Sequence, residues 1–478
     1  MRSLPVVASL FLATIGVVPV ASASPELPTT VRIPPPVGEH AAAAQVLYFN
    51  RCRGGCTVTA SATNDARSHL STIPQGAPGE MFTLTEFRHG DVVWNGLMQC
   101  LREVYSPFNV VITDELPAPG VAYNENIVAG IDNEINYPGA GGVAPVTSDC
   151  SPYSYVSSFT FANGYGPDVY QLCYVAAQET GHAFGMADHA WAFIADGRSA
   201  CSDPMSYRND CLSNGQRFFR NEAATCGDFA QESCNCAGMN PHSKLLAALG
   251  AGTPITPPPN LAVTQPVAGT QVTNGQMVIS TASSQRGVKI IELYLNGFKW
   301  GEKKGVPFGQ TNQPEAAYAI PMPADVPGGV IDIVVVAKDD IGITTTAPTI
   351  TVMKGAPCTS ADSCAKGQKC EEGRCFWDPA SGEIGDTCTY PQFCLTGTCM
   401  GPSADEQICT QSCIPGVGDS CPMDYYCLAT GPSSGACWPE GAEEAGCCST
   451  SDGAVTGSAL LAFGLLAILA PRRRRRRA

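Results

Sequence analysis

Charge is scarce in this 478-residue chain, since Asp, Glu, Lys and Arg together make up only 15% of it, and positive charge is the scarcer kind. Lys and Arg number 28 against 43 acidic residues, and seven of the 28 are Arg2 and the arginines at 472–477. Without those seven, no basic stripe remains that would bind a nucleic-acid backbone. We therefore expect no nucleic acid as a partner and attribute the acidity to ordinary solubility.

Long apolar runs stand at the two ends of the chain. The first follows Arg2, extends from Val6 to Val20 and precedes Ala21-Ser22-Ala23. A basic residue, a short apolar run and small residues in this order are typical of a secretory signal peptide. We assign residues 1–23 to such a peptide rather than to a membrane anchor, because the run is short and contains Pro19.

The second apolar run, from Gly453 to Ala470, follows Cys447-Cys448 and precedes the arginines at 472–477. A run of this length just spans a bilayer, and a basic block holds its end in the cytoplasm. This order of cysteines, apolar helix and arginine cluster resembles the C-terminal sorting tags of myxobacterial surface proteins. The resemblance implies that residues 438–478 are processed and attach the protein to the cell envelope. A simple tail anchor is the alternative.

Cysteine is abundant, with 24 residues, an even number that allows complete pairing. Ten lie between Cys52 and Cys236, and twelve lie between Cys358 and Cys437. In an exported protein, cysteines in such numbers form disulfides. We therefore expect an exported protein, secreted or held at the cell surface, that disulfides stabilise.

A proline-rich linker at 253–260 separates a first domain, residues 24–252, from the rest of the chain. Residues 261–354 contain no cysteine and alternate apolar and polar residues in short runs, which predicts strands. These strands are predicted at 278–282, 290–295, 331–337 and 349–353, and Asn296-Gly297 predicts a hairpin turn. The segment resembles bacterial immunoglobulin-like modules, which implies a β-sandwich. We expect it to act as a spacer.

Residues 355–437 are a cysteine-dense array with an internal repeat. Cys358, Cys388 and Cys421 each begin a C-x5-C unit, at intervals of 30 and 33 residues. Units this small cannot fold on apolar burial alone and need disulfides. Zinc binding by these cysteines is the alternative, which we disfavour because exported thiols oxidise and the array has no histidine. We expect a stalk or adhesion element.

The first domain is predicted to be α/β (α+β). Its strands are expected at 45–50, 107–113, 141–145 and 156–161. Apolar residues at helical spacing predict a helix from Val93 to Val104. Asp168 would cap a second helix that runs to about Phe184.

The end of this second helix carries residues that indicate chemistry. Gln178 and His182 are four residues apart and point to one spot on a helix, and Glu179 lies beside them. Gly185 lets the chain leave the helix sharply, because glycine takes positive φ freely. The spacing therefore predicts that donor side chains gather where the helix ends.

The stretch 178–189 resembles the zinc-binding helix of the metzincin metallopeptidases, H-E-x-x-H-x-x-G-x-x-H, with its first ligand changed to Gln178. The resemblance implies a Zn²⁺ site that uses His182 and either Asp188 or His189. Gln178 is a poorer donor than imidazole. The resemblance also implies that Glu179 is the general base toward a zinc-bound water that hydrolyses a peptide bond.

Downstream, Met205 and Tyr207 lie between Cys201 and Cys211. By the same resemblance, they match a methionine turn beneath the metal and a tyrosine that reaches it in some metzincins. An ordinary core methionine is the alternative for Met205. The remaining histidines have no motif context, and we expect structural roles for them. They are His40, His69, His89 and His242.

Two functions follow from the resemblance. In the first, the chain is an exported, surface-attached zinc endopeptidase that acts on proteins or peptides. In the second, it is an inactive pseudo-peptidase that keeps the fold for binding or adhesion. The presence of Glu179 favours the first, because an inactive site has no chemical need for that carboxylate, while the loss of histidine at 178 favours the second. A third function is adhesion through the immunoglobulin-like and cysteine-rich modules.

Overall fold

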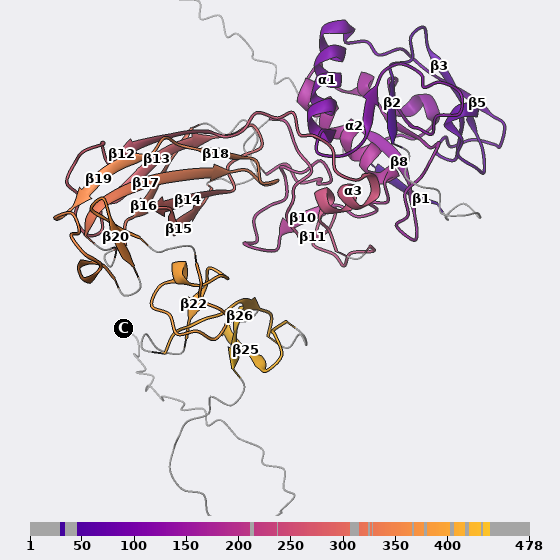
Figure 1. The fold of residues 1–478 in the computed structure, drawn as a ribbon. Coiled ribbons are helices and arrows are strands. Elements are labelled where there is room, and N and C mark those ends of the chain that lie inside the picture. Colours follow the sequence, from indigo (N-terminus) through magenta and orange to yellow (C-terminus); the bar gives the residue numbers. More distant parts are fainter. Residues whose placement is uncertain are drawn as a thin grey trace, which may run out of the picture. The chain divides into compact units, whose positions relative to one another are not determined.

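The computed structural model describes most of the chain between Thr29 and Pro439 (Figure 1). The described residues are 29–33, 45–210, 215–236, 238–305, 315–323, 326, 328–365, 368–376, 380–401, 406–415, 420–431 and 434–439. The predicted signal peptide and the apolar, arginine-rich tail lie outside them. Within these residues, no helix combines the length and apolarity that crossing a membrane requires. The chain divides into two compact units, Met1–Pro379 and Ala380–Ala478.

A six-stranded sheet forms the centre of the first domain. In order across the sheet, its strands are β1 (Thr29–Ile33), β8 (Gly142–Thr147), β9 (Ser157–Thr160), β7 (Asn124–Val128), β2 (Val46–Asn50) and β6 (Val111–Thr113). All neighbouring strands run parallel except β8 and β9, which run antiparallel. The strands β7, β8 and β9 are buried along their whole length, which indicates a sheet covered on both faces.

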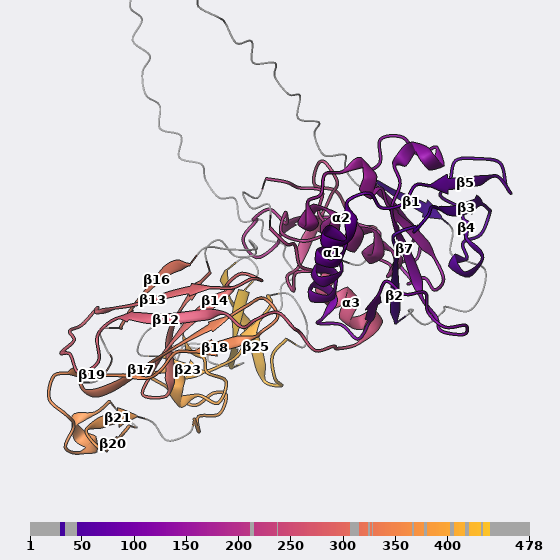
Figure 2. The same ribbon diagram turned by 90° about the horizontal axis from the view of Figure 1, so that it is seen from above.

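Helices cover one face of this sheet, and a small sheet covers the other (Figure 2). The helices α1 (Gly90–Tyr105) and α2 (Val169–Ala183) share a core with Leu47 and Phe49 of β2, and the disulfide Cys100–Cys173 joins them. The small sheet has the order β4 (Leu70–Ser71), β3 (Cys56–Ala60), β5 (Met81–Leu84). Its side chains pack with those of β7 and β9. Helices and strands are therefore layered, as the sequence predicts for an α/β domain.

The helix α2 begins where the sequence predicts it. Asp168 Oδ1 accepts hydrogen bonds from the backbone N–H groups of Tyr170 and Gln171, at 2.9 and 3.1 Å. These bonds satisfy amides that the first turn of a helix leaves free. Two strands, β10 (Ala190–Phe193) and β11 (Ala224–Cys226), and the helix α3 (Pro241–Leu249) follow α2 and complete the domain. Their buried side chains belong to the same core as those of α1 and α2.

Residues 260–354 form two antiparallel sheets around one core, a β-sandwich. One sheet has the order β12 (Asn260–Gln265), β13 (Met277–Ser283), β16 (Ala316–Pro321). The other has the order β15 (Phe298–Lys304), β14 (Ile290–Leu295), β17 (Gly329–Lys338), β18 (Thr344–Thr346), with β19 (Ile350–Lys354) beside β17. Asn296 and Gly297 have φ values of 46° and 85° in the turn between β14 and β15, which confirms the predicted hairpin.

Three small cysteine modules follow, each with four cysteines that pair first with third and second with fourth. The pairs are Cys358–Cys370, Cys364–Cys375, Cys388–Cys399, Cys394–Cys409, Cys413–Cys427 and Cys421–Cys437. The C-x5-C spacing predicted that Cys421 begins a module. Cys421 is instead the second cysteine of its module, because Cys413 precedes it and pairs with Cys427, which lies between Cys421 and its partner Cys437. The first module belongs to the first compact unit, and the other two belong to the second.

The strands of these modules are β20 (Lys369–Glu371), β21 (Arg374–Phe376), β22 (Cys399–Met400), β23 (Ile408–Cys409), β24 (Ser412–Cys413), β25 (Tyr425–Gly431) and β26 (Ser434–Pro439). Single 3₁₀ turns lie at Ala66–Ser68, Asp132–Ile135, Ala162–Gly164, Ala361–Ser363 and Pro391–Phe393. The protein is therefore β-rich, multidomain and disulfide-rich, as expected. Disulfides in this number are typical of proteins exported to an oxidising compartment.

Candidate metal and catalytic site

The last turns of α2 bury three of the predicted site residues. The side chains of Gln178, Glu179 and His182 are fully buried, with 0% of their surface exposed. Strand β8 presses against the helix here, since a Cβ atom added to Gly142 would lie 2.7 Å from Glu179 Oε1. A glycine at 142 therefore makes room for the carboxylate between the helix and the antiparallel strand.

Gly185 ends the helix as the sequence predicts. Its φ of 84° lies in the region that favours glycine, and an added Cβ would lie 2.2 Å from the carbonyl oxygen of Cys150. The disulfide Cys150–Cys236 holds this crossing. The chain consequently turns back toward α2 and brings His189 to His182.

The two imidazoles are both buried and lie edge to face. The ring centroids of His182 and His189 are 5.0 Å apart, with an interplanar angle of 82°. His182 Nδ1 donates to the carbonyl oxygen of Met186 at 2.5 Å, and His189 Nδ1 donates to Asp228 Oδ1 at 2.7 Å. Because both acceptors engage Nδ1–H, each Nε2 carries the lone pair. Among the described residues, neither Nε2 has a hydrogen-bond partner.

Gln178 and Glu179, the neighbouring side chains on α2, also lack hydrogen-bond partners among the described residues. Both carboxylate oxygens of Glu179 and both amide atoms of Gln178 are buried and, within the described part of the chain, have no hydrogen-bond partner. Burial raises the pKa of Glu179 well above its usual value and lowers the pKa of His182 to about 3. Buried polar atoms without partners are costly. Lone pairs from two neutral imidazoles and one amide oxygen, next to a carboxylate, are a donor set that fits a divalent cation such as zinc.

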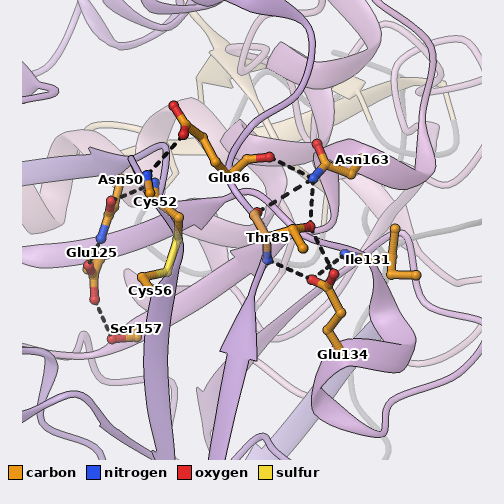
Figure 3. The surroundings of a disulfide bond; sticks show 11 residues. Asn50, Cys52, Cys56, Thr85, Glu86, Glu125, Ile131, Glu134, Ser157 and Asn163 are labelled. Atoms are coloured by element: carbon orange, nitrogen blue, oxygen red, sulfur yellow. Dashed lines mark hydrogen bonds between the residues drawn. A yellow bond between two sulfur atoms is a disulfide. The ribbon is translucent and has the colours of Figure 1, made fainter.

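Glu125, a second buried carboxylate in the domain, does have hydrogen-bond partners and serves as a comparison. Glu125 accepts hydrogen bonds from Asn50 Nδ2 at 2.9 Å and from Ser157 Oγ at 2.8 Å, beside the disulfide Cys52–Cys56 (Figure 3). Burial raises its pKa too. Glu125 therefore has hydrogen-bond partners within the sheet, whereas Glu179 has none in the part of the chain that the structure describes.

Asp188, the other candidate for the third ligand, does not join the cluster. Its two carboxylate oxygens accept hydrogen bonds from the backbone N–H groups of Asn235 and Cys236, at 2.9 to 3.0 Å, and from the side-chain amide of Asn235. These donors turn the carboxylate toward the 235–236 segment. Of the two residues that the sequence left open, His189 is therefore the one that lies beside His182 and whose Nε2 has no partner among the residues described.

Met205 and Tyr207 lie against the two histidines. A Cβ added to Gly181, next to His182, would lie 2.7 Å from Met205 Sδ, so the thioether packs directly on this turn of α2. The ring of Tyr207 stacks on His189 with 3.8 Å between centroids. Burial, followed by the nearby Glu179 carboxylate, raises the pKa of Tyr207 above its ordinary value. The structure therefore brings both predicted support residues to the site.

Sequence reasoning missed Asp228. It lies in a loop that the disulfide Cys226–Cys234 closes, and its bond to Nδ1 fixes the orientation of His189. A cavity of about 240 Å³ opens beside it, lined by Ala187, Asp188, His189, Cys226, Gly227, Asp228, Glu232, Ser233 and Asn235. The only signal in the sequence was an acidic residue inside a short cysteine-framed loop, which no spacing rule connects to a histidine 39 residues away.

The other described histidines have structural surroundings. His89 Nε2 lies 2.9 Å from the carbonyl oxygen of Ala162, His69 is the left-handed C-cap of a 3₁₀ turn, and His242 packs on Phe108 with 5.1 Å between centroids. His40 lies outside the described residues.

Tight groups of metal-binding side chains also occur in the cysteine modules. Across the described residues, the only trios of His, Cys, Asp or Glu donors within 4.8 Å of one another are Cys358–Cys364–Cys370, Cys388–Cys394–Cys409 and Cys413–Cys421–Cys437. All nine cysteines are in disulfides, so none offers a thiolate. The two histidines and the carboxylates near α2 are gathered less tightly than these sulfurs.

No family model matches the chain, and no curated protein matches it. Among solved structures, it is similar to the fibronectin(III)-like modules of Clostridium thermocellum CbhA, with 21% identity, a TM-score of 0.15, and coverage of 20% of this chain and 94% of that one. It is also similar to the endo-beta-1,4-mannanase from Thermotoga petrophila, with 12% identity, a TM-score of 0.16 and 27% of each chain covered. An LPMO from Kitasatospora papulosa gives 13% identity, a TM-score of 0.14, and coverage of 19% of this chain and 53% of that one. TM-scores this low carry no conclusion about fold or function.

Proposed function

We propose that residues 24–252 are a metzincin-like zinc metallopeptidase domain in an exported protein, with Glu179 as the general base. One observation supports this proposal above all. His182 and His189 each have Nδ1 engaged by an acceptor and a buried Nε2 that has no hydrogen-bond partner among the described residues, and their ring centroids lie 5.0 Å apart. Two imidazoles prepared in this way are typical of histidines that bind a metal through Nε2.

The residues that would hold the zinc are His182 and His189 through Nε2 and Gln178 through Oε1. All three side chains are buried and offer lone pairs without a net negative charge. Asp228 and the Met186 carbonyl hold the two rings in orientation. Met205 and Tyr207 pack beneath and beside them. A neutral amide at position 178 predicts a weaker site than three histidines would give.

Glu179 supplies the proton transfer in this proposal. When bound, zinc would act as a Lewis acid that polarises the scissile carbonyl. The Glu179 carboxylate, whose pKa burial raises, would accept a proton from the attacking water and deliver it to the leaving amine. The cavity beside His189 gives a substrate side chain a place to bind. We expect the substrate to be a protein or peptide.

The second candidate is a pseudo-peptidase that binds proteins without cleaving them. Gln178 favours this function, because a glutamine stands where the metzincin pattern has its first histidine. Attachment to the cell surface through the tag at 438–478 is part of both proposals, and residues 440–478 lie outside the described residues. Mass spectrometry of the mature C-terminus tests it, since an intact arginine tail would exclude processing.

Metal analysis separates the two candidates. The purified full-length protein should contain close to one zinc per chain after dialysis, and a strong chelator should lower both its melting temperature and its cleavage of denatured protein. Metal-free protein, with a melting temperature unchanged by chelator and no cleavage after zinc is added, would reject the peptidase and leave the binding function.

A further inference from the structure

The β-sandwich meets the first domain through buried charges. Arg286 lies between β13 and β14, Asp340 lies between β17 and β18, and Arg220 belongs to the first domain. The side chains of all three have 0% exposure. Buried charges persist only when they are paired, and removing one partner of such a group is strongly unfavourable. The sequence predicts that the sandwich is a spacer. A spacer would not need buried charges shared with the first domain.

These charged side chains form hydrogen bonds and ion pairs between the sandwich and the first domain. Arg286 Nε and Nη2 donate to the two carboxylate oxygens of Asp340, at 2.9 and 3.0 Å. Arg286 Nη2 also donates to the carbonyl oxygen of Phe219 at 3.3 Å. Arg220 Nη1 donates to the carbonyl oxygen of Arg286 and lies 3.7 Å from Asp340 Oδ2. Phe219 and Arg220 of the first domain are therefore both hydrogen-bonded to Arg286 of the sandwich.

Arg220 also contacts the turn that carries Met205, through Asp203. The backbone N–H of Arg220 donates to Asp203 Oδ2 at 2.7 Å, and the backbone N–H of Met205 donates to Asp203 Oδ1 at 2.8 Å. The guanidinium of Arg220 also reaches the carbonyl oxygen of Ser202 at 3.4 Å. Asp203, which is fully buried, thus joins residue 220 to the Met205 turn.

The Met205 turn in turn supports both histidines. The backbone N–H of Ala190, the residue after His189, donates to the Met205 carbonyl oxygen at 2.6 Å. The Met205 thioether packs on Gly181, the residue before His182. A shift of this turn would therefore move both candidate ligands relative to each other.

We propose that the β-sandwich stabilises the geometry of the candidate metal site. In this proposal, Arg286, Asp340 and Arg220 are positioning residues for the ligands of that site. This inference rests on the proposed function for the identity of the ligand, zinc. Through Arg220, a chain of contacts runs from Asp340 to Asp203 and Met205, and so connects the sandwich to the turn that packs beside both imidazoles.

The test compares Asp340→Asn with a matched control, Asp332→Asn, in the full-length protein. Asp332 lies in the same sandwich and pairs with Arg374, away from the first domain, at 2.8 Å. Two quantities are measured: the zinc dissociation constant by chelator competition, and hydrogen exchange at the backbone amides of Met205 and Ala190 without metal. We expect Asp340→Asn to weaken zinc binding at least tenfold and to speed exchange at both amides, and Asp332→Asn to change neither.

Arg286→Lys is the second variant, because it keeps the buried charge and loses the two-point contact with Asp340 and the contact with the Phe219 carbonyl. It should weaken zinc binding several-fold while the sandwich keeps its melting transition. Folded variants with unchanged zinc affinity and unchanged exchange at Met205 and Ala190 would overturn the inference. If the variants speed hydrogen exchange at Met205 and Ala190 but the natural protein does not bind zinc, the proposed function is rejected. The positioning role of the sandwich then still holds.

Discussion

His189 Nδ1 lies 2.7 Å from Asp228 Oδ1, and this bond leaves the opposite ring nitrogen without a partner among the described residues. The carboxylate comes from a loop that Cys226 and Cys234 close, so a disulfide holds the group that orients the ring. A carboxylate in this position fixes the tautomer and the orientation of an imidazole.

Asp228→Ala should therefore weaken zinc binding by about 10- to 100-fold, the usual effect of losing such a partner. Asp210→Ala is the matched control, because Asp210 pairs with Arg208 at the surface nearby and touches neither histidine. Chelator competition measures both. Equal affinities in the two variants would mean that Asp228 does not orient His189.

Glu179→Gln should separate binding from chemistry. The variant keeps the shape of the side chain and loses its capacity to take a proton, so kcat should fall by about 10²- to 10⁴-fold. Zinc affinity should change little, because Glu179 is not among the proposed ligands. A variant that loses zinc instead would make Glu179 a ligand, and a variant as active as the natural protein would remove the base from the mechanism.

Gln178→His should restore the metzincin pattern. Imidazole is a better zinc donor than an amide, so zinc should bind more tightly and peptidase activity should rise. A large rise would mean that Gln178 limits the natural enzyme. Tighter zinc binding with no peptide cleavage would instead support the pseudo-peptidase.

Gly185→Ala should destabilise the first domain by about 3 kcal/mol or more, because it adds a positive-φ strain to a clash with the Cys150 carbonyl. Gly197→Ala is the control, since Gly197 also has positive φ, 71°, but its added Cβ meets nothing within 4 Å. The control should cost about 1 to 2 kcal/mol, the strain of an L side chain at positive φ alone. Denaturant unfolding measures both, and equal losses would mean that the crossing at Cys150 is not tight in solution.

The cavity beside His189 predicts a preference for basic side chains. Asp188, Asp228 and Glu232 line it, and no Lys or Arg does. Glu232→Gln should lower kcat/KM for peptides with Lys or Arg near the cleaved bond by about two- to fivefold, as expected for an exposed charge pair. Peptides with uncharged residues should be cleaved equally by both proteins. A matching loss on uncharged peptides would mean that Glu232 acts on stability and not on selection.

Local patterns predicted much of the fold. The helix that begins at Asp168, the hairpin at Asn296-Gly297 and the sharp exit at Gly185 all depend on residues a few positions apart, and all are present. Cys421 was placed wrongly as the start of a module, because spacing does not say which cysteine is its partner. The metzincin identity of the first domain stays a proposal.

The sequence alone determined the donors on α2, because helical geometry fixes where Gln178, Glu179 and His182 point once the helix forms. It left Asp188 and His189 as equals, and no spacing rule connected Asp228 to His189 or Asp340 to Met205. Only the tertiary structure decided these, since each depends on segments tens of residues apart that meet through disulfides and buried charges. Such meetings are set by the packing of the whole compact unit, which no local periodicity encodes.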